Sequence, residues 1–396
     1  MRLVILEAES LGKDMDLSGF SRFGEVTVYE KTTEEECPER VREADIVICN
    51  KVRMCSRTLS GAENLKLICV TATGINNIDL DYVKRHNIAV TNVAGYSTVS
   101  VAQHTFAMYF YLAEKLRYYD DYVKNGSYAA SSLFTCMDRP FTELEGKTWG
   151  IIGLGAIGAL IANAAVSLGM NVCGYDPYLS VDAAWRLSRD VKHEVNLDGI
   201  YAKADYISIN VPYTDQTFHM LDARAFSKMK DGVRIINESR AEIVDDDAML
   251  AAIASGRVGK YVTDFPNEKV VGVDNIIALP HLGACTPESE EKSAVMAARE
   301  LYDYLANGNI KNSVNFPDAT LERMGVSRVC ILHQNVPTML NQFLEITCST
   351  GLNVENMINK AYGAYAYAMI DLNGRLDDDQ VAKIDRIPEV IRVRVV

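Results

Sequence analysis

Three polar side chains stand soon after apolar, strand-like runs in the second half of the chain, at the kind of position where parallel sheets gather ligands. They are Arg240, Glu268 and His281. An arginine can bind a carboxylate through its planar fork, a histidine can exchange a hydroxyl proton, and a carboxylate can hold that histidine in one tautomer. These are the residue types that hydride transfer to or from a 2-hydroxy acid requires. Each residue alone is also compatible with a surface charge or a structural histidine.

A glycine-rich stretch, Gly153–Gly158, lies between an apolar run at 148–152 and a helical pattern. Glycines at this spacing let the backbone turn tightly, approach a pyrophosphate and pack a helix on a strand. Asp176 ends the next apolar run, where a carboxylate can bind both ribose hydroxyls and repel a 2′-phosphate. Pro177 and Tyr178 supply no arginine for that phosphate. The pattern predicts a site for NAD rather than NADP, the alternative being a glycine turn and an exposed carboxylate.

The composition excludes several classes of protein. With 396 residues, the chain is long enough for two or three domains. A formal charge of −13 argues against sequence-independent binding to nucleic acid or to an anionic membrane, so we expect neither partner. The nine cysteines have no tight spacing, so we expect no metal site and a reducing, cytoplasmic location. The N-terminus becomes charged too early for a signal peptide, and no apolar run is long enough to cross a bilayer.

The spacing of apolar runs predicts an α/β protein. The first hundred residues alternate short apolar runs with helical patterns, which is the rhythm of a parallel sheet. A helical pattern from Ser97 to Leu116 leads into a second series of βα repeats. We therefore expect two doubly wound, Rossmann-like domains with parallel sheets. Their expected bounds are 1–98 with 288–316 for a substrate-binding domain and 99–287 for an NAD-binding domain.

A smaller module is expected at the end of the chain. An amphipathic helix is predicted over 288–306, and a proline-bearing linker follows at 315–320. Residues 325–396 then show the order strand, helix, strand, strand, helix, strand. A βαββαβ order of this length predicts a ferredoxin-like fold.

Several motifs, in their order along the chain, resemble the D-isomer-specific 2-hydroxyacid dehydrogenases. The glycine stretch with Asp176 and the runs Asn237–Arg240, Phe265–Glu268 and Pro280–Ala284 carry the resemblance, which covers residues 1–315. It implies that Arg240, Glu268 and His281 are catalytic, and that Thr73 and Gly74 hold the carboxylate of a small anionic 2-hydroxy or 2-keto acid. It also implies NAD-binding positions, which are Gly153, Leu154, Gly155, Ala156, Ile157, Gly158, Asp176, Pro177, Val211, Pro212, Thr217, Ser239, Asp264, His281 and Gly283.

One position departs from the family pattern. Family members have an aspartate that binds the carboxamide of the nicotinamide, and counting back from Glu268 puts Thr263 at that position. Asp264 fills the role only if the intervening loop is one residue shorter. The choice between Thr263 and Asp264 is therefore open.

The C-terminal module resembles the ACT regulatory domain, and residues 148–315 resemble family members that oxidise 3-phosphoglycerate. The resemblance implies an amino-acid effector such as serine, bound by His333, Asn335 and Asn353 between paired domains. It also implies a homodimer or homotetramer. Ordinary turn chemistry is the alternative explanation for the three effector residues.

The first hundred residues point to a different substrate. The runs Asn50–Val52 and Asn92–Thr98 resemble members that act on glycerate or hydroxypyruvate, which carry no phosphate. Lys51, Arg53 and Arg57 still offer positive charge for a phosphate, although a lysine recognises it less specifically than a guanidinium. Two alternatives therefore stay open beside oxidation of 3-phosphoglycerate. They are reduction of hydroxypyruvate or a broader set of 2-keto acids, and a non-catalytic sensor that binds NAD.

Overall fold

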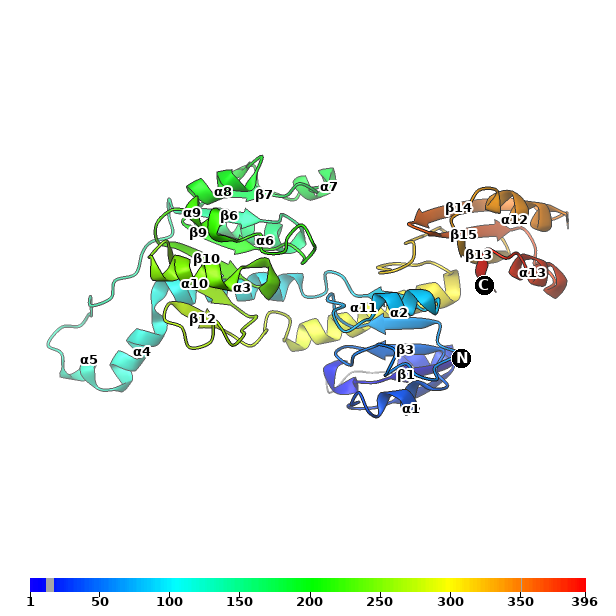
Figure 1. Cartoon of the computed structure of the whole chain (residues 1–396), viewed down its shortest axis with the longest axis horizontal. Coiled ribbons are helices and arrows are strands. Elements are labelled where there is room, and N and C mark those ends of the chain that lie inside the picture. Colours follow the sequence, from blue (N-terminus) through cyan, green and yellow to red (C-terminus); the bar gives the residue numbers. More distant parts are fainter. Residues whose placement is uncertain (12–17, 350) are drawn as a thin grey trace. The chain divides into compact units, whose positions relative to one another are not determined.

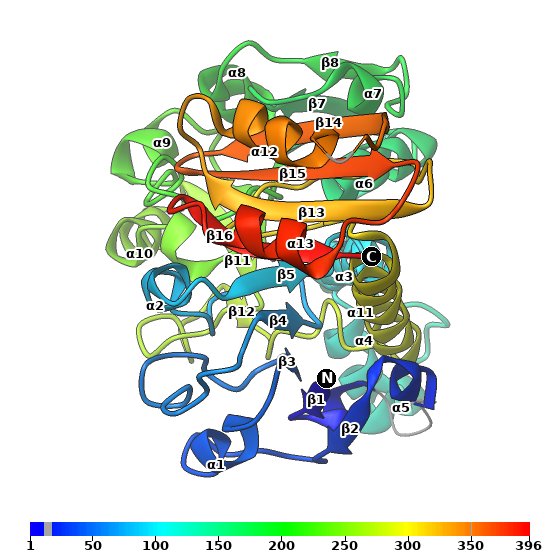
Figure 2. The ribbon, with the colours of Figure 1, turned by 90° about the vertical axis from the view of Figure 1, so that its right-hand side faces the viewer.

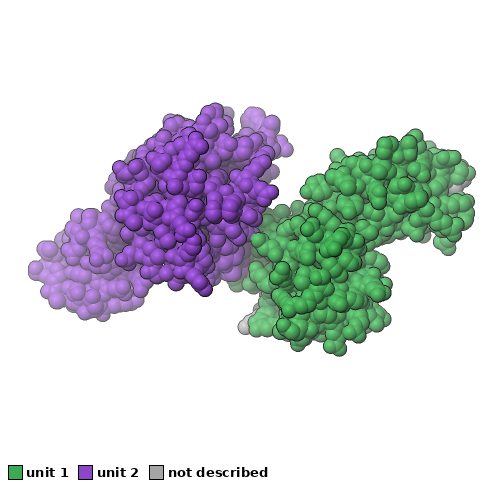
Figure 3. All heavy atoms as spheres, viewed as in Figure 1, with its two compact units in different colours: residues 1–96, 287–396 green, residues 97–286 purple. Residues whose placement is uncertain are grey.

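The computed structural model describes residues 1–11, 18–349 and 351–396. The chain divides into two compact units, drawn in green and purple in Figure 3. The first unit contains residues 1–96 and 287–396, and the second contains residues 97–286. The expected substrate-binding segments and the C-terminal module thus belong to the same unit, and the dinucleotide-binding segment forms the other.

The first unit is built on a parallel sheet in the order β2-β1-β3-β4-β5. One face packs on α1 (Cys37–Val41) and α2 (Leu80–Arg85), and the other packs on α11 (Pro287–Asn307). The central strands are buried throughout because helices cover both faces, which explains their unbroken apolar sequences. The strands are β1 (Arg2–Ile5), β2 (Glu25–Val28), β3 (Ile46–Cys49), β4 (Leu67–Val70) and β5 (Ala89–Asn92), with 3-10 turns at Ala8–Leu11 and Ser18–Phe23.

The second unit is built on a parallel sheet in the order β12-β11-β10-β9-β6-β7-β8. Taken from β8, this is the Rossmann strand order with one more strand at the far edge. One face packs on α3 (Thr98–Glu114) and α6, and the other packs on α8, α9 and α10. The strands are β6 (Thr148–Ile152), β7 (Asn171–Tyr175), β8 (Val191–His193), β9 (Tyr206–Ile209), β10 (Val233–Asn237), β11 (Val258–Thr263) and β12 (Ile276–Ala278). The helices are α6 (Ala156–Ser167), α7 (Val181–Ala184), α8 (Leu197–Lys203), α9 (Ala223–Ser227) and α10 (Asp246–Ala254), with a 3-10 turn at Ala241–Ile243.

The helical pattern predicted over 97–116 is interrupted near its end. Helix α3 covers Thr98–Glu114 and stops at Lys115, whose φ of 54° lies in the left-handed region. The chain then continues into α4 (Leu116–Lys124) and α5 (Ser127–Ala130), which extend away from the sheet of their own unit (Figure 1). The residues that follow reach β6 without further regular structure.

The C-terminal module has the predicted βαββαβ order. Its antiparallel sheet runs β14-β15-β13-β16, and the two helices lie on one face of it (Figure 2). The opposite face packs on Phe316, Ala319 and Ala89 within the first unit. The elements are β13 (Ser327–Gln334), α12 (Met339–Cys348), β14 (Val354–Tyr362), β15 (Tyr365–Leu372), α13 (Asp378–Asp385) and β16 (Val390–Val395).

A buried ion pair fastens this module to the end of α11. Arg328 and Asp371 are both fully buried, and the Arg328 Nε lies 2.6 Å from Asp371 Oδ1. The Arg328 guanidinium also donates to the carbonyls of Asn307, Leu321 and Glu322 at 2.7, 3.0 and 3.1 Å. The pair therefore connects two strands of the module to the segment that precedes it.

Candidate active site

The glycine loop joins β6 to α6, and its three glycines have different structural roles. Gly153 has a φ of 91°, and a Cβ there would lie 2.5 Å from the carbonyl oxygen of Asn210. A Cβ on Gly158 would lie 1.9 Å from the carbonyl oxygen of Gly153. A Cβ on Gly155, in contrast, would meet nothing within 4 Å. Two glycines thus permit close packing, and Gly155 leaves the outer side of the loop open at the N-terminus of α6, where backbone N–H groups suit a pyrophosphate.

Asp176 lies just past the end of β7, the strand beside β6. Its Oδ2 accepts a hydrogen bond from the backbone N–H of Leu154 at 2.9 Å, and its Oδ1 accepts one from that of Tyr178 at 2.9 Å. These bonds fix the carboxylate against the glycine loop and leave lone pairs for ribose hydroxyls. The geometry fits the adenosine half of NAD.

The other predicted cofactor positions lie at the same edge of the sheet. The stretch from Val211 to Thr217 follows β9, and Ser239 follows β10. The hydroxyl of Thr217 donates to the Pro212 carbonyl at 2.8 Å, and that of Ser239 donates to the Ile209 carbonyl at 2.7 Å. Because the carboxyl ends of neighbouring parallel strands share an edge, these residues line the side of the sheet that carries the glycine loop.

The carboxylate beside His281 belongs to Asp264. The His281 Nδ1 lies 2.8 Å from the Oδ2 of Asp264, which is buried, and the backbone N–H of His281 donates to the Asp264 carbonyl at 3.0 Å. Glu268, the expected partner of His281, is exposed and forms no hydrogen bond or ion pair with the described residues. Strand β11 ends at Thr263, so Asp264 is the first residue beyond the strand, whereas Glu268 lies four residues farther along the turn.

Arg240 is held near the same pair. It follows β10, and the Nδ2 of Asn237 donates to its carbonyl at 2.9 Å. Its guanidinium carbon lies 5.3 Å from the centre of the Phe265 ring, and that ring lies 4.5 Å from the ring of His281. The structure thus brings Arg240, Asp264 and His281 together around Phe265.

Three further polar residues, which sequence reasoning missed, gather here. The Oε2 of Glu238 lies 2.6 Å from the hydroxyl of Thr105 on α3, and a Cβ on Gly283 would lie 2.2 Å from the Oε1 of Glu238. Burial, helped by the nearby Asp264 and opposed by the hydrogen bond with Thr105, raises the pKa of Glu238 to about 8. Burial also lowers the pKa of His104, which is adjacent to Thr105. The signal in the sequence was a carboxylate directly after a buried strand, two residues before Arg240.

The buried polar atoms of this cluster fit the carboxamide of a nicotinamide. Within the described part of the chain, the Oδ1 of Asp264, the Oε1 of Glu238 and the Nε2 of His104 are buried and have no hydrogen-bond partner. Buried polar atoms are normally paired, and a carboxamide carries two N–H donors and one carbonyl acceptor. The hydroxyl of Thr263 already accepts from the backbone N–H of Phe265 at 3.1 Å, whereas the Oδ1 of Asp264 has no partner among the described residues. The geometry therefore favours Asp264 over Thr263 for the carboxamide.

The predicted substrate residues lie in the first unit. The hydroxyl of Thr73 donates to the Val93 carbonyl at 2.9 Å, which orders the loop that contains Gly74. Lys51 and Arg53 are exposed, and Arg57 forms an ion pair with Glu34.

Glu7, which sequence reasoning also missed, caps the loop that contains Lys51. A single oxygen of Glu7, Oε2, accepts hydrogen bonds from the backbone N–H groups of Asn50, Lys51 and Val52 at 2.8, 2.8 and 3.1 Å. Glu7 stands two residues beyond the end of β1. A carboxylate thus accepts from three consecutive backbone N–H groups of this loop.

The predicted effector residues lie at two ends of the C-terminal sheet. His333 bonds to Asn359 through Nε2 at 3.2 Å, and the side chain of Asn335 donates to the Gly363 carbonyl at 3.3 Å. Asn353 precedes β14 and donates to Glu355 at 3.1 Å. The register pairs Gln334 with Tyr365 but Val354 with Leu372, so the two groups are separated by roughly 23 Å along β15 at 3.3 Å per residue.

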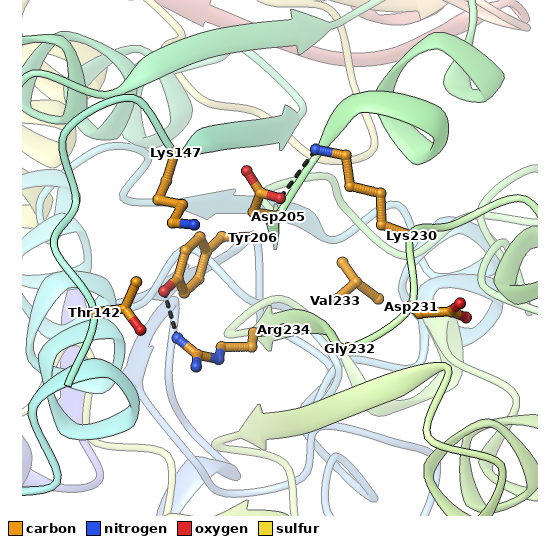
Figure 4. A pocket seen from close by; sticks show the side chains of 9 residues that line it. All are labelled: Thr142, Lys147, Asp205, Tyr206, Lys230, Asp231, Gly232, Val233 and Arg234. Atoms are coloured by element: carbon orange, nitrogen blue, oxygen red, sulfur yellow. Dashed lines mark hydrogen bonds and ion pairs between the residues drawn. The ribbon is translucent and has the colours of Figure 1, made fainter. Parts of the chain in front are cut away.

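The cavity shown in Figure 4 lies elsewhere. It has a volume of about 150 Å³ and is lined by residues before or at the starts of β6, β9 and β10, among them Lys147, Lys230 and Arg234. These are the amino ends of the strands, so the cavity is at the opposite edge from the glycine loop. The described residues contain no group of three His, Cys, Asp or Glu that could hold a metal ion. They also contain no helix long and apolar enough to span a membrane.

A Rossmann sheet with a glycine loop, a strand-end carboxylate and a histidine–carboxylate pair defines an NAD-binding oxidoreductase. Comparison with known proteins specifies the family. The model of the D-isomer specific 2-hydroxyacid dehydrogenase, NAD binding domain, matches residues 106–283. The chain belongs to the D-isomer specific 2-hydroxyacid dehydrogenase family and uses NAD as its cofactor.

Several curated relatives show how far the similarity extends. The chain is 31% identical over 301 residues to D-3-phosphoglycerate dehydrogenase of Archaeoglobus fulgidus, covering 74% of this chain and 55% of that protein. It is 31% identical over 365 residues to D-3-phosphoglycerate dehydrogenase 1 of Saccharomyces cerevisiae, covering 86% and 75%. It is 30% identical over 326 residues to hydroxypyruvate reductase of Blautia hydrogenotrophica, covering 80% and 100%. The solved D-lactate dehydrogenase of Aquifex aeolicus with NAD and lactic acid has a TM-score of 0.66 and 27% identity, covering 80% of this chain and 100% of that one.

Proposed function

We propose that the chain oxidises 3-phosphoglycerate to 3-phosphohydroxypyruvate. The contact between His281 and buried Asp264 is the observation that supports proton transfer by His281, because a general base needs a fixed orientation. His281 takes the hydroxyl proton as the C–O bond becomes a carbonyl, and Asp264 stabilises the resulting imidazolium. Arg240 binds the substrate carboxylate through its guanidinium, and Thr73 and Gly74 offer backbone N–H groups to it. NAD, when bound, supplies the acceptor for the hydride that leaves C2.

The phosphorylated substrate is supported by the comparisons. Relatives that match most of this chain include D-3-phosphoglycerate dehydrogenases from an archaeon and a yeast. Lys51 and Arg53 are the exposed cations available for the phosphate. The test is a set of initial rates of NADH oxidation with phosphohydroxypyruvate, hydroxypyruvate, glyoxylate, pyruvate and 2-oxoglutarate. The proposal requires phosphohydroxypyruvate to have the highest kcat/KM, and turnover of no 2-keto acid despite NADH binding would favour a sensor.

Reduction of hydroxypyruvate is a second candidate, which one observation favours. Glu7 places negative charge on the loop from Asn50 to Val52 and occupies its backbone donors. A phosphate at that loop would meet a like charge and lack free N–H groups, whereas an unphosphorylated substrate would not. A relative named hydroxypyruvate reductase is also matched along its whole length.

Two variants separate these candidates. Lys51→Ala should weaken turnover of phosphohydroxypyruvate much more than that of hydroxypyruvate if the phosphate binds there. Glu7→Gln keeps the shape of the side chain and removes its charge. If the unphosphorylated compound is the natural substrate, this variant should narrow the preference for hydroxypyruvate over phosphohydroxypyruvate, and Lys51→Ala should affect both compounds equally.

We further propose that the C-terminal module is an ACT domain that binds serine or a similar amino acid between two copies of the chain. Its element order supports this, and so does the separation of Asn353 from His333 and Asn335, because one copy alone does not bring them together. Calorimetry should detect serine binding that Asn335→Ala and Asn353→Ala both weaken, with NADH affinity unchanged. No heat with any amino acid would leave the module with a role in assembly.

We also propose a homodimer or homotetramer, because an effector site between two C-terminal modules requires two copies of the chain. The segment that includes α4 and α5 also exposes several large apolar side chains, which suit contact with a second copy. They are Leu116, Val123, Tyr128, Leu133, Phe134, Met137 and Phe141. Light scattering of the wild type and of Phe134→Asp tests whether this segment joins two copies.

A further inference from the structure

The side chain of Glu238 is fixed by a contact that connects two elements of the second unit. It leaves the turn after β10 and meets the hydroxyl of Thr105 on α3 at 2.6 Å. The same hydroxyl lies 3.0 Å from the carbonyl oxygen of Val101. Asn237 and Ser239, on either side of Glu238, are held by their own hydrogen bonds to Arg240 and Ile209. The carboxyl group is therefore held in one place by its surroundings.

One oxygen of this carboxyl group is engaged, and the other can accept a hydrogen bond in either charge state. When the group is ionised, the Thr105 hydroxyl donates to Oε2 at 2.6 Å. When the group is neutral, Glu238 can donate its O–H to Thr105, whose single hydrogen then goes to the Val101 carbonyl. Burial raises the pKa of Glu238 to about 8, so the neutral form is present at pH 7, and Oε1 is then the carbonyl oxygen of the acid.

That oxygen points into the catalytic cluster. Oε1 is buried, has no hydrogen-bond partner among the described residues, and lies where a Cβ on Gly283 would be 2.2 Å away. Gly283 follows His281 by two residues, and Arg240 follows Glu238 by two. A nicotinamide that exchanges hydride with a substrate held by Arg240 and His281 must lie beside them, and its only polar group is the carboxamide.

We propose that Glu238 is a positioning residue for the cofactor, a neutral acid whose Oε1 accepts one N–H of the nicotinamide carboxamide while Asp264 Oδ1 accepts the other. The inference rests on the binding of NAD and is independent of which 2-hydroxy acid is the substrate. It adds to the dehydrogenase site a residue that orients the reacting ring through the carboxamide.

The test measures binding with two probes, NADH and ADP-ribose, which lacks the nicotinamide. Glu238→Ala should raise the Kd of NADH by about 3- to 10-fold, the worth of one hydrogen bond, and leave the Kd of ADP-ribose unchanged. Glu238→Gln should restore NADH affinity, because its amide oxygen can accept from the carboxamide and its NH₂ can donate to Thr105. Unchanged NADH affinity in Glu238→Ala would overturn the proposal. So would an equal loss for ADP-ribose, which also reports a folding defect.

A second measurement follows the charge of Glu238. Above pH 8 its carboxylate would stand beside the cationic ring of NAD+, so the Kd ratio of NADH to NAD+ should rise at least about 3-fold between pH 7 and 9.5 in the wild type. The ratio should stay flat in Glu238→Gln. Asp264, Arg240, His281 and His104 also face the site, but all four are present in both proteins, so the difference between the two profiles belongs to Glu238. Parallel profiles would overturn the proposal.

Discussion

Two carboxylates compete for the role beside His281, and single substitutions separate them. Asp264→Asn keeps the shape of the side chain but cannot stabilise an imidazolium by charge, so kcat should fall by about two orders of magnitude or more. Glu268→Gln is the matched control and should change kcat less than about threefold, because Glu268 is exposed and has no hydrogen-bond partner among the described residues. Steady-state kinetics at saturating NADH provide the measurement. The opposite ranking would make Glu268 the partner of His281 during turnover.

Asp176 is predicted to control the choice of cofactor. Asp176→Ala removes a charged acceptor for the ribose hydroxyls, worth roughly 1.5–3 kcal/mol, so the Kd of NADH should rise about tenfold or more while that of NADPH falls relative to it. Fluorescence titration with both cofactors measures the change. Asp176→Asn can still accept from the Leu154 N–H. It therefore distinguishes a lost ribose contact from a disordered glycine loop, and equal affinities in all three proteins would remove Asp176 from the site.

At the scale of elements, alanine substitutions at two glycines of the loop should have different effects, one on stability and the other on cofactor binding. Gly158→Ala places a methyl 1.9 Å from the Gly153 carbonyl oxygen, so the free energy of unfolding should drop by about 1–3 kcal/mol. Gly155→Ala meets no atom within 4 Å and should change stability by less than about 0.5 kcal/mol. It should still weaken NADH binding strongly, because the pyrophosphate needs close approach to the backbone. Thermal unfolding and NADH titration of both variants check this, and a stable Gly158→Ala would contradict the packing role.

At the scale of the whole molecule, several hydrogen bonds hold the C-terminal module to the rest of the first unit. Besides Arg328, the hydroxyl of Tyr367 donates to the Gly308 carbonyl at 2.8 Å, and Arg394 donates to the Tyr304 carbonyl at 2.6 Å. Arg392 donates to the Asn87 carbonyl at 3.1 Å. These contacts satisfy carbonyls at the end of α11 and beside the parallel sheet, which a deletion would expose.

A chain ended at Asp318 should therefore retain dehydrogenase activity per folded molecule and lose any response to serine, but unfold at a lower temperature. Arg328→Met should reproduce the loss of stability, by about 3–5 kcal/mol, because it leaves Asp371 charged and buried. The double variant Arg328→Met with Asp371→Leu should recover much of that loss. Differential scanning calorimetry measures all three, and an unchanged Tm after truncation would show that the module contributes nothing to the stability of the unit.

The sequence by itself determined the elements and much of the site. The apolar runs at 46–49 and 171–175 coincide with β3 and β7, because parallel strands covered on both faces leave unbroken apolar patterns. The run at 390–395 coincides with β16, an antiparallel strand whose residues are mostly half-buried. The three glycines, Asp176, Arg240 and His281 could be found in the same way. Strand β8 was missed, since three partly exposed residues carry little periodicity.

Only the tertiary structure decided which of these residues meet. Asp264 rather than Glu268 pairs with His281 because β11 ends at Thr263, and the end of a strand is poorly defined by sequence. Glu238 joins Thr105 across 133 positions of sequence, and Glu7 caps a loop 43 or more positions away. Contacts of this kind depend on the packing of a helix on a sheet and of one strand end beside another. Local sequence patterns do not indicate which residues far apart in the sequence come into contact. The partners of these carboxylates are therefore known only from the folded chain.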